Sequence, residues 1–212
     1  MATIDRSATP IPYRQIRAYY DDKTITVYQA YSESIATAAV ASQNLTASPD
    51  FSYDRMTWIK PSWCWMLYRS GYSLKDSRQS RILALKMTHE NFLNLLRQAA
   101  VCRNEALTNE EKARKVRVQW DPERSPRLGA LGYRSIQIGI GRGLSGKWAE
   151  EWVEGIEDVT ERALRFKEVV EGDREVGVED LVERGLMPVE RVYEVPKELR
   201  ELLGMGEGME RD

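Results

Sequence analysis

The chain has 212 residues, of which 42% are hydrophobic and 30% are charged, a composition typical of a globular protein large enough to bury a substantial core. No apolar run approaches the roughly 18 residues of a membrane span, and the two cysteines, Cys64 and Cys102, show no disulfide-framework spacing. A membrane protein is therefore excluded, and because residues 1–10 lack an apolar signal core we expect an intracellular protein, cytoplasmic or nuclear.

The net charge of -2 conceals an asymmetry along the chain. Residues 1–150 contain 22 Lys and Arg against 14 Asp and Glu, whereas the remainder is strongly acidic. All six Trp and nine of the ten Tyr precede residue 153. We therefore expect the chemistry in the first 150 residues. The predicted organisation is a tail over 1–10, a single domain over 11–203 whose acidic helical part begins near 151, and a flexible tail over 204–212.

The first half of the chain predicts an opening hairpin and two helices. β-branched and aromatic residues flank Asp21-Asp22-Lys23, which predicts two strands joined by a turn. Pro61 fits the first position of a helix that Gly71 ends. The expected elements are strands 14–20 and 24–30, a helix over 33–43, a strand over 56–60 and the helix that follows Pro61.

The second half predicts alternating short strands and helices. Ile136, Ile138 and Ile140 would face the core, leaving Gln137 on the opposite face for ligand or solvent. The fold class is α+β, with a mixed, mostly antiparallel sheet flanked by helices. The expected elements are strand 81–87, helix 88–100, a polar connection over 103–113, strands 116–120 and 134–140, helices 147–154, 160–170 and 178–184, strand 191–195 and helix 196–203.

The segment 55–72 concentrates three Trp, two Tyr and three cationic residues. Such a surface can stack on planar groups and hold phosphates, so a nucleotide or a nucleic acid is the first ligand to consider. The alternative is a scaffold whose aromatic residues are core, since Trp and Tyr are commonly buried. Lys60 and Arg69 would then only pair with carboxylates. Exposure of Trp58, Lys60 and Arg69 separates the two interpretations.

Two arginines in otherwise apolar strands, Arg17 and Arg134, must be paired or face a polar cleft, and each can grip a phosphate. The run Gly141–Lys147 also fits phosphate-loop spacings, but Trp148 replaces the Ser or Thr that contacts magnesium, which favours a plain turn. His89 is the only histidine. One histidine and two separated cysteines cannot build a zinc site, so we predict no metal.

Five blocks of sequence together resemble one family. They agree in order over about residues 12–196, and they are similar to the uncharacterised family DUF4291, a domain of unknown function, which implies a fold-sized grouping but no reaction. The blocks are Ile16–Asp21, Thr24–Tyr31, Met56–Ser62 with Tyr68–Gly71, Gln119–Arg124 and Arg134–Gly139.

The order of elements is also similar, more weakly, to the small ADP-ribosyltransferase-like families, which implies a split sheet and NAD as the substrate. Where those families usually carry His after a hydrophobic-Tyr pair, this chain has Gln29, which can hydrogen-bond a ribose hydroxyl. This resemblance implies an NAD-using transferase or glycohydrolase of unspecified acceptor. The implied site is Gln29 on ribose, Gln137 orienting acceptor or water, Arg17 and Arg134 on pyrophosphate, Tyr31 and Trp58 stacking on a base, and Lys60 and Arg69 beside the cofactor.

Two points stay open at this level. No carboxylate can be placed to stabilise an oxocarbenium-like transition state, although Glu150 and Asp121 are candidates. The alternative function is an RNA or single-stranded nucleic-acid binding module without catalysis, in which the basic part and its rings form a stacking platform.

Overall fold

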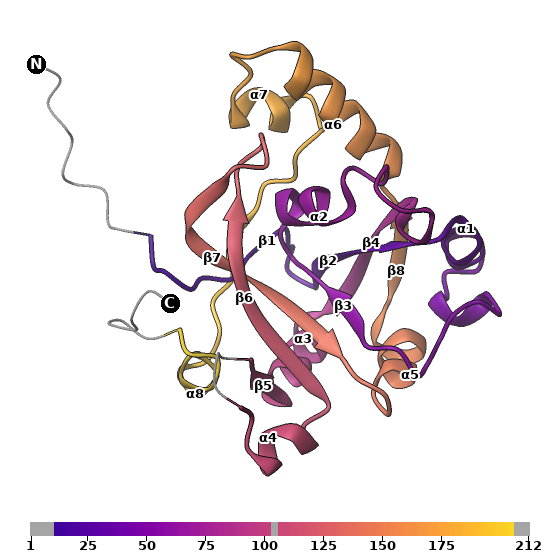
Figure 1. Cartoon of the computed structure of the whole chain (residues 1–212), viewed down its shortest axis with the longest axis vertical. Coiled ribbons are helices and arrows are strands. Elements are labelled where there is room, and N and C mark those ends of the chain that lie inside the picture. The colour runs from indigo at the N-terminus through magenta and orange to yellow at the C-terminus, as the bar shows by residue number, and fades with distance from the viewer. Residues whose placement is uncertain (1–10, 103–105, 206–212) are drawn as a thin grey trace, which may run out of the picture.

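The computed structural model describes residues 11–102 and 106–205. Their strands form two main sheets and one two-stranded ribbon (Figure 1). The predicted tail over 1–10, and residues 206–212 of the tail predicted from 204, lie outside the described residues.

The first sheet has three antiparallel strands in the order β2-β4-β8. Its strands are β2 (Thr24–Tyr31), β4 (Arg81–Thr88) and β8 (Gly155–Asp158). Helix α1 (Glu33–Ser42) packs against β4 and β8. The residues that alternate toward the interior, among them Ile25, Val27, Leu83 and Leu85, are completely buried, so apolar burial fixes the register.

The second sheet has four strands in the order β3-β7-β6-β5, antiparallel except for the β5 and β6 pair. Its strands are β3 (Thr57–Ile59), β7 (Ala130–Ile140), β6 (Val116–Arg124) and β5 (Ala99–Val101). Ile136, Ile138 and Ile140 are buried as expected. The α+β class with mixed, mostly antiparallel sheets is therefore confirmed.

The two sheets meet at one isolated bridge between β2 and the residue that follows β3. Tyr28 N donates to Lys60 O at 2.7 Å, and Lys60 N donates to Tyr28 O at 3.0 Å. Beyond this bridge, β2 pairs with β4 and β3 pairs with β7, so Gln29–Tyr31 and Thr57–Ile59 are not paired with each other. The combined sheet is consequently split along this line.

Helices cover both ends of the molecule. Figure 1 shows α6 and α7 at one end of the long strands β6 and β7, and α4 at the other. The remaining helices are α2 (Trp63–Ser70), α3 (His89–Arg97), α4 (Asn109–Ala113), α5 (Ser145–Lys147), α6 (Thr160–Gly172), α7 (Val178–Glu183) and α8 (Lys197–Leu202). Short 3-10 turns occur at Leu45–Ala47 and Ser77–Gln79, and a π-helical turn at Trp148–Trp152. No described helix has the length and apolarity needed to cross a membrane.

Helix α2 shows how the local sequence sets an element beside the split. Ser62 caps its start by accepting from Trp65 N at 3.2 Å, and Gly71 ends it in the left-handed region with a φ of 56°. The buried face carries Trp63 and Leu67, which pack with Tyr28 and Phe166 in a core cluster of their own. The predicted helix after Pro61 is thus confirmed.

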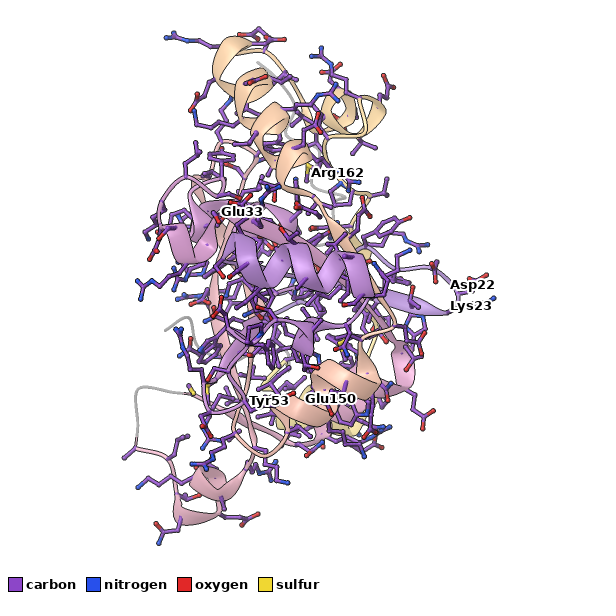
Figure 2. All side chains as sticks on the ribbon, turned by 90° about the vertical axis from the view of Figure 1, so that its right-hand side faces the viewer. Asp22, Lys23, Glu33, Tyr53, Glu150 and Arg162 are labelled. Carbon is purple, nitrogen blue, oxygen red and sulfur yellow. The ribbon has the colours of Figure 1, made fainter. Side chains whose placement is uncertain are left out.

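Several predicted boundaries are wrong, and one predicted pairing fails. The opening hairpin reduces to one bridge between Tyr20 and Ile25, because β1 (Arg17–Ala18) pairs instead with β9 (Arg191–Val192) from the far end of the chain. Figure 2 shows Asp22 and Lys23 projecting into solvent at the turn.

The helix predicted to reach residue 100 ends at Arg97, because the apolar residues of β5 pair with β6. Part of the predicted polar connection is helix α4, which has a Thr108–Glu111 capping box; residues 103–105 lie outside the described part. The helix predicted over 147–154 is a π-helical turn followed by β8, which completes the first sheet.

Candidate functional site

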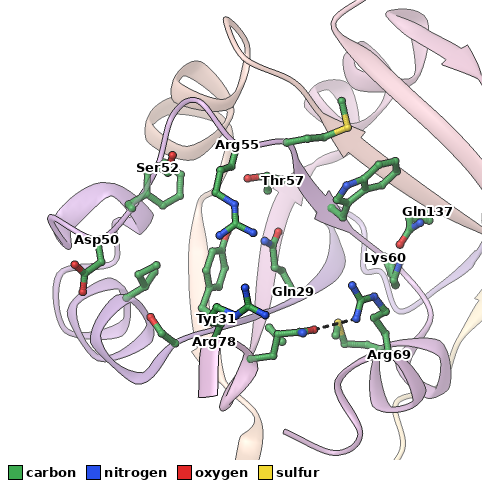
Figure 3. A pocket seen from close by; sticks show the side chains of 18 of the residues that line it. Gln29, Tyr31, Asp50, Ser52, Arg55, Thr57, Lys60, Arg69, Arg78 and Gln137 are labelled. Atoms are coloured by element: carbon green, nitrogen blue, oxygen red, sulfur yellow. Dashed lines mark hydrogen bonds between the residues drawn. The ribbon is translucent and has the colours of Figure 1, made fainter. Parts of the chain in front are cut away.

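A cavity of about 760 Å³ opens where the two sheets separate (Figure 3). Its walls come from the end of β2, the start of α1, the loop before β3, β3 itself, α2 and the turn at Ser77–Gln79. A volume of this size is typical of small-molecule sites. It lies on the side of the Tyr28 to Lys60 bridge where the strands no longer pair.

Six of the eight predicted site residues line this cavity. They are Gln29, Tyr31, Trp58, Lys60, Arg69 and Gln137. Residues two apart on a strand share a face, so β2 presents Gln29 with Tyr31, and the β3 segment presents Trp58 with Lys60. These residues are far apart in sequence, and the split brings them together.

Arg17 and Arg134 do not line the cavity. Arg17 donates to Gln15 Oε1 at 3.3 Å and to the carbonyl oxygen of Glu190 at 3.2 Å. Arg134 donates through Nε to the Tyr13 hydroxyl at 2.7 Å. Both guanidinium groups therefore join segments of the chain. Each arginine is paired, which is one of the two outcomes expected for an arginine in an apolar strand.

Three buried polar atoms of the cavity residues lack a hydrogen-bond partner within the described residues. They are Lys60 Nζ, Gln29 Oε1 and the Tyr31 hydroxyl. Buried polar atoms are almost always paired, and leaving one unpaired costs about 1–3 kcal/mol. Three such atoms among the residues of one cavity are available to hydrogen-bond a molecule that enters it.

Lys60 has the most unusual environment of the three. The residue is only 2% exposed, and its Nζ lies 3.5 Å from the ring centroid of Trp65. Burial lowers the pKa of the Lys60 amine well below its usual value, and the nearby Arg69 charge lowers it further. The Asp121 carboxyl group opposes this shift, although burial raises the pKa of Asp121 as well. The amine is consequently uncharged in a larger fraction than a lysine in solvent.

Arginines give the cavity its positive charge. Arg69 Nη1 donates to Gln79 Oε1 at 3.4 Å, and Arg78 forms an ion pair with Asp76 at 2.7 Å that leaves its side chain 76% exposed. Arg55 is exposed, and Figure 3 shows its guanidinium directed toward Gln29. Three guanidinium groups around one hollow suit an anion with several oxygens.

The floor and the rim are polar as well. Gln137 Nε2 donates to Gln119 Oε1 at 2.7 Å across the β6 and β7 pair, which fixes both amides. Asp50 lines the cavity and accepts from the Ser34 hydroxyl at 2.7 Å. Of the two carboxylates considered from the sequence, Glu150 accepts from the Tyr53 hydroxyl at 2.8 Å at the surface (Figure 2) and Asp121 does not line the cavity.

Sequence reasoning missed Arg78, Asp50 and Gln119 as cavity residues. Arg55 belonged to the cationic and aromatic segment but was not singled out. Asp50 and Arg78 lie in irregular polar segments, where no periodicity indicates direction. Gln119 had a signal, because its alternation with Val116 and Val118 in β6 placed it opposite the buried face.

The glycine-rich turn and the histidine have structural roles. Gly146 lies against the Tyr53 ring, and Ser145 donates to the Tyr53 carbonyl oxygen at 2.8 Å. The His89 ring nitrogens contact the Tyr193 hydroxyl at 3.0 Å and the Asp21 carbonyl oxygen at 2.9 Å. Neither the turn nor His89 reaches the cavity. Across residues 11–102 and 106–205, no group of three potential metal-ligating side chains occurs.

The aromatic segment divides among the core, the cavity and the surface, where Tyr68 is 43% exposed and does not line the cavity. Trp63, Trp65 and Tyr72 are buried, whereas Trp58 is half-buried and Arg69 is exposed at the cavity. The scaffold interpretation therefore describes most of the rings, and the ligand interpretation describes the residues that face the cavity.

Fold and site together define an α+β protein with a cationic cavity at the division between two sheets. Residues 15–193 match the family described as a domain of unknown function (DUF4291), and the chain belongs to that family. No curated protein matches the sequence.

Proposed function

We propose that the cavity binds NAD and that the protein is an ADP-ribosyltransferase-like transferase or glycohydrolase. The observation that carries the proposal is the gathering of Gln29, Lys60 and Arg69 with two further arginines in one hollow at the split of the sheet. A divided sheet with an NAD cleft is what the resemblance to ADP-ribosyltransferase-like families implies.

The cavity residues suggest a role for each part of NAD. Arg55, Arg69 and Arg78 take the pyrophosphate, in place of Arg17 and Arg134. Gln29 Oε1, which has no partner among the described residues, accepts from a ribose hydroxyl. Half-buried Trp58 offers a ring for stacking.

Cleavage of the nicotinamide bond develops positive charge on the ribose, which a carboxylate stabilises. Among the described residues, Asp50 is the carboxylate that lines the cavity, and its hydrogen bond from Ser34 orients it. Gln137, held by Gln119, orients the acceptor or a water molecule. The reaction exchanges the bond from ribose to nicotinamide for a bond to that acceptor.

The test combines binding and turnover. NAD is expected to raise the melting temperature of the full chain, and chromatography is expected to detect released nicotinamide. Gln29→Ala and Arg69→Ala should each reduce the rate by at least about tenfold, the loss expected when a hydrogen bond or ion pair of roughly 1.4 kcal/mol is removed. Arg200→Ala removes an exposed arginine that does not line the cavity and serves as the control. Absence of both the thermal shift and nicotinamide release contradicts the proposal.

The nucleic-acid alternative depended on exposed rings beside a basic surface. Burial of Trp63, Trp65 and Tyr72 removes three rings from that platform, although Tyr19, Tyr53 and Tyr68 are exposed. The cavity between the sheets is the reason to place a small molecule first. Labelled single-stranded RNA tested in parallel distinguishes the two. Salt-sensitive retention of RNA without any response to NAD supports the binding module instead.

A further inference from the structure

We propose that Lys60 is a nucleophile that forms an imine with the carbonyl carbon of a phosphorylated sugar bound in the cavity. The ligand class, a ribose phosphate or ADP-ribose in its open aldehyde form, follows from an amine beside three guanidinium groups. The inference deepens the proposed function because both use the same cavity, but the imine does not require NAD to be cleaved.

Lys60 is positioned by its backbone. Its N–H and carbonyl group both hydrogen-bond to Tyr28, at 3.0 Å and 2.7 Å, at the bridge where the two sheets meet. These bonds fix the backbone of Lys60 where the two sheets meet. From this fixed point the side chain runs inside the fold, 2% exposed and among the residues that line the cavity, rather than on a mobile surface segment.

Structural alternatives for the amine do not account for its position. No described residue accepts a hydrogen bond from Nζ, and no salt bridge includes it among the described residues. The face of the Trp65 ring lies 3.5 Å from Nζ and offers the ammonium form a cation–π contact, which offsets only part of the cost of burying an amine that is 2% exposed.

The environment also produces the reactive state. Burial lowers the pKa of the amine well below its usual value despite the opposing charge of Asp121, and the Arg69 charge adds to the shift, so a larger fraction of this amine is uncharged than of a lysine in solvent. Desolvation and a neighbouring cation are the two ways in which lysine nucleophiles are activated. Figure 3 shows Lys60 with Gln137 on one side and Arg69 on the other, in a cavity that also contains Arg55 and Arg78.

The chemical step balances without a further reactant. The Nζ lone pair adds to the aldehyde carbon, the carbonyl oxygen takes a proton, and the resulting carbinolamine loses water to give a C=N bond. Phosphate or pyrophosphate oxygens meanwhile contact the arginines. The Tyr31 hydroxyl, which burial keeps protonated by raising its pKa, is an unpartnered donor in the same cavity.

The experiment traps the imine by reduction. The full chain is incubated with ribose 5-phosphate or ADP-ribose and sodium cyanoborohydride at pH 6.5, and the modified residue is located by peptide mass spectrometry. Lysines in solvent are almost fully protonated at this pH. The expected result is labelling of Lys60 at least about tenfold above that of Lys23, which is exposed at the β2 turn (Figure 2).

Two variants and a competitor make the result decisive. Lys60→Met must abolish the specific label, whereas Lys23→Arg must leave labelling of Lys60 unchanged. Inorganic pyrophosphate must reduce labelling if the arginines hold the phosphate groups. Labelling spread evenly over exposed lysines overturns the inference, and so does an unlabelled Lys60 in folded protein.

Failure of this inference is distinguishable from failure of the proposed function. Labelled Lys60 without nicotinamide release from NAD supports the nucleophile and contradicts the NAD reaction. Nicotinamide release with an unlabelled Lys60 supports the NAD reaction and contradicts the nucleophile.

Discussion

The Lys60 amine has a cost in stability that its replacement should reveal. A buried amine without a hydrogen-bond partner is desolvated in the folded protein and hydrated in the unfolded chain. We expect Lys60→Met, of similar length and apolar, to raise the free energy of unfolding by about 1–3 kcal/mol while it abolishes ligand chemistry. Urea unfolding measures the gain.

The pH dependence of this gain has a definite sign. The folded state lowers the pKa of Lys60, so the folded chain binds fewer protons than the unfolded chain below the usual lysine value of 10.5. The penalty therefore shrinks as the pH rises toward that value, and the gain from Lys60→Met should be larger at pH 6 than at pH 9. Lys23→Met, at an exposed position, is the control. A less stable Lys60→Met variant contradicts the argument.

At the scale of single residues, the sequence predicted polar and aromatic residues that face the cavity from regular strands. Gln29 and Gln137 were identifiable because strand alternation separates a polar position from a buried face. The same reasoning left two outcomes open for Arg17 and Arg134, since an arginine in a strand satisfies its charge equally well in a polar cleft or through carbonyl oxygens and a tyrosine hydroxyl. Which of these occurs depends on segments 173 and 121 residues away in sequence.

At the scale of elements, helix α2 connects stability to the site because it carries Arg69 and ends at Gly71. Gly71 has a φ of 56°, and a Cβ there would lie 3.0 Å from the Lys75 Cβ. We expect Gly71→Ala to destabilise the protein by about 1 kcal/mol and to weaken ligand binding. Thermal unfolding and titration with ADP-ribose measure both effects.

The chain offers a matched control for this substitution. Gly172 ends α6, and a Cβ there would meet nothing within 4 Å. Gly172→Ala should be neutral or slightly stabilising, by up to about 1 kcal/mol, because alanine favours the helix. Equal destabilisation by the two substitutions contradicts the role assigned to the left-handed turn.

Elements with strong local signals were predictable, and elements defined by a distant partner were not. Helix α2 has a cap, a buried stripe and a terminating glycine within its own sequence. β5 and β8 have only three and four residues, and they are strands because β6 and β4 offer free edges. The hairpin prediction failed for the same reason, since β9 supplies the partner of β1.

At the scale of the whole molecule, the segment around Glu190 returns the acidic end of the chain to its beginning. The carbonyl oxygen of Glu190 accepts from Arg17, and its carboxyl group accepts from Trp63 N at 2.6 Å, at the start of α2. The split and its cavity were therefore not readable from any single segment. They require the two sheets, α2 and the segment around Glu190, which contact one another only in the folded chain.

Glu190 should make the stability of this arrangement depend on pH. Burial and the neighbouring Glu123 carboxyl raise the pKa of Glu190 to about 8 from its usual 4.5, so the folded chain binds more protons than the unfolded chain between these values. This contribution to stability is complete below the unfolded pKa and is lost as the pH rises through 8. We expect the free energy of unfolding to fall by roughly 2 kcal/mol between pH 6 and pH 9.

Glu190→Gln keeps an oxygen for Trp63 N and removes the titration, so it should abolish most of this fall, whereas Glu194→Gln, at an exposed position, should not. Urea unfolding at the two pH values decides the matter, and an unchanged fall in Glu190→Gln contradicts the assignment to this carboxyl group.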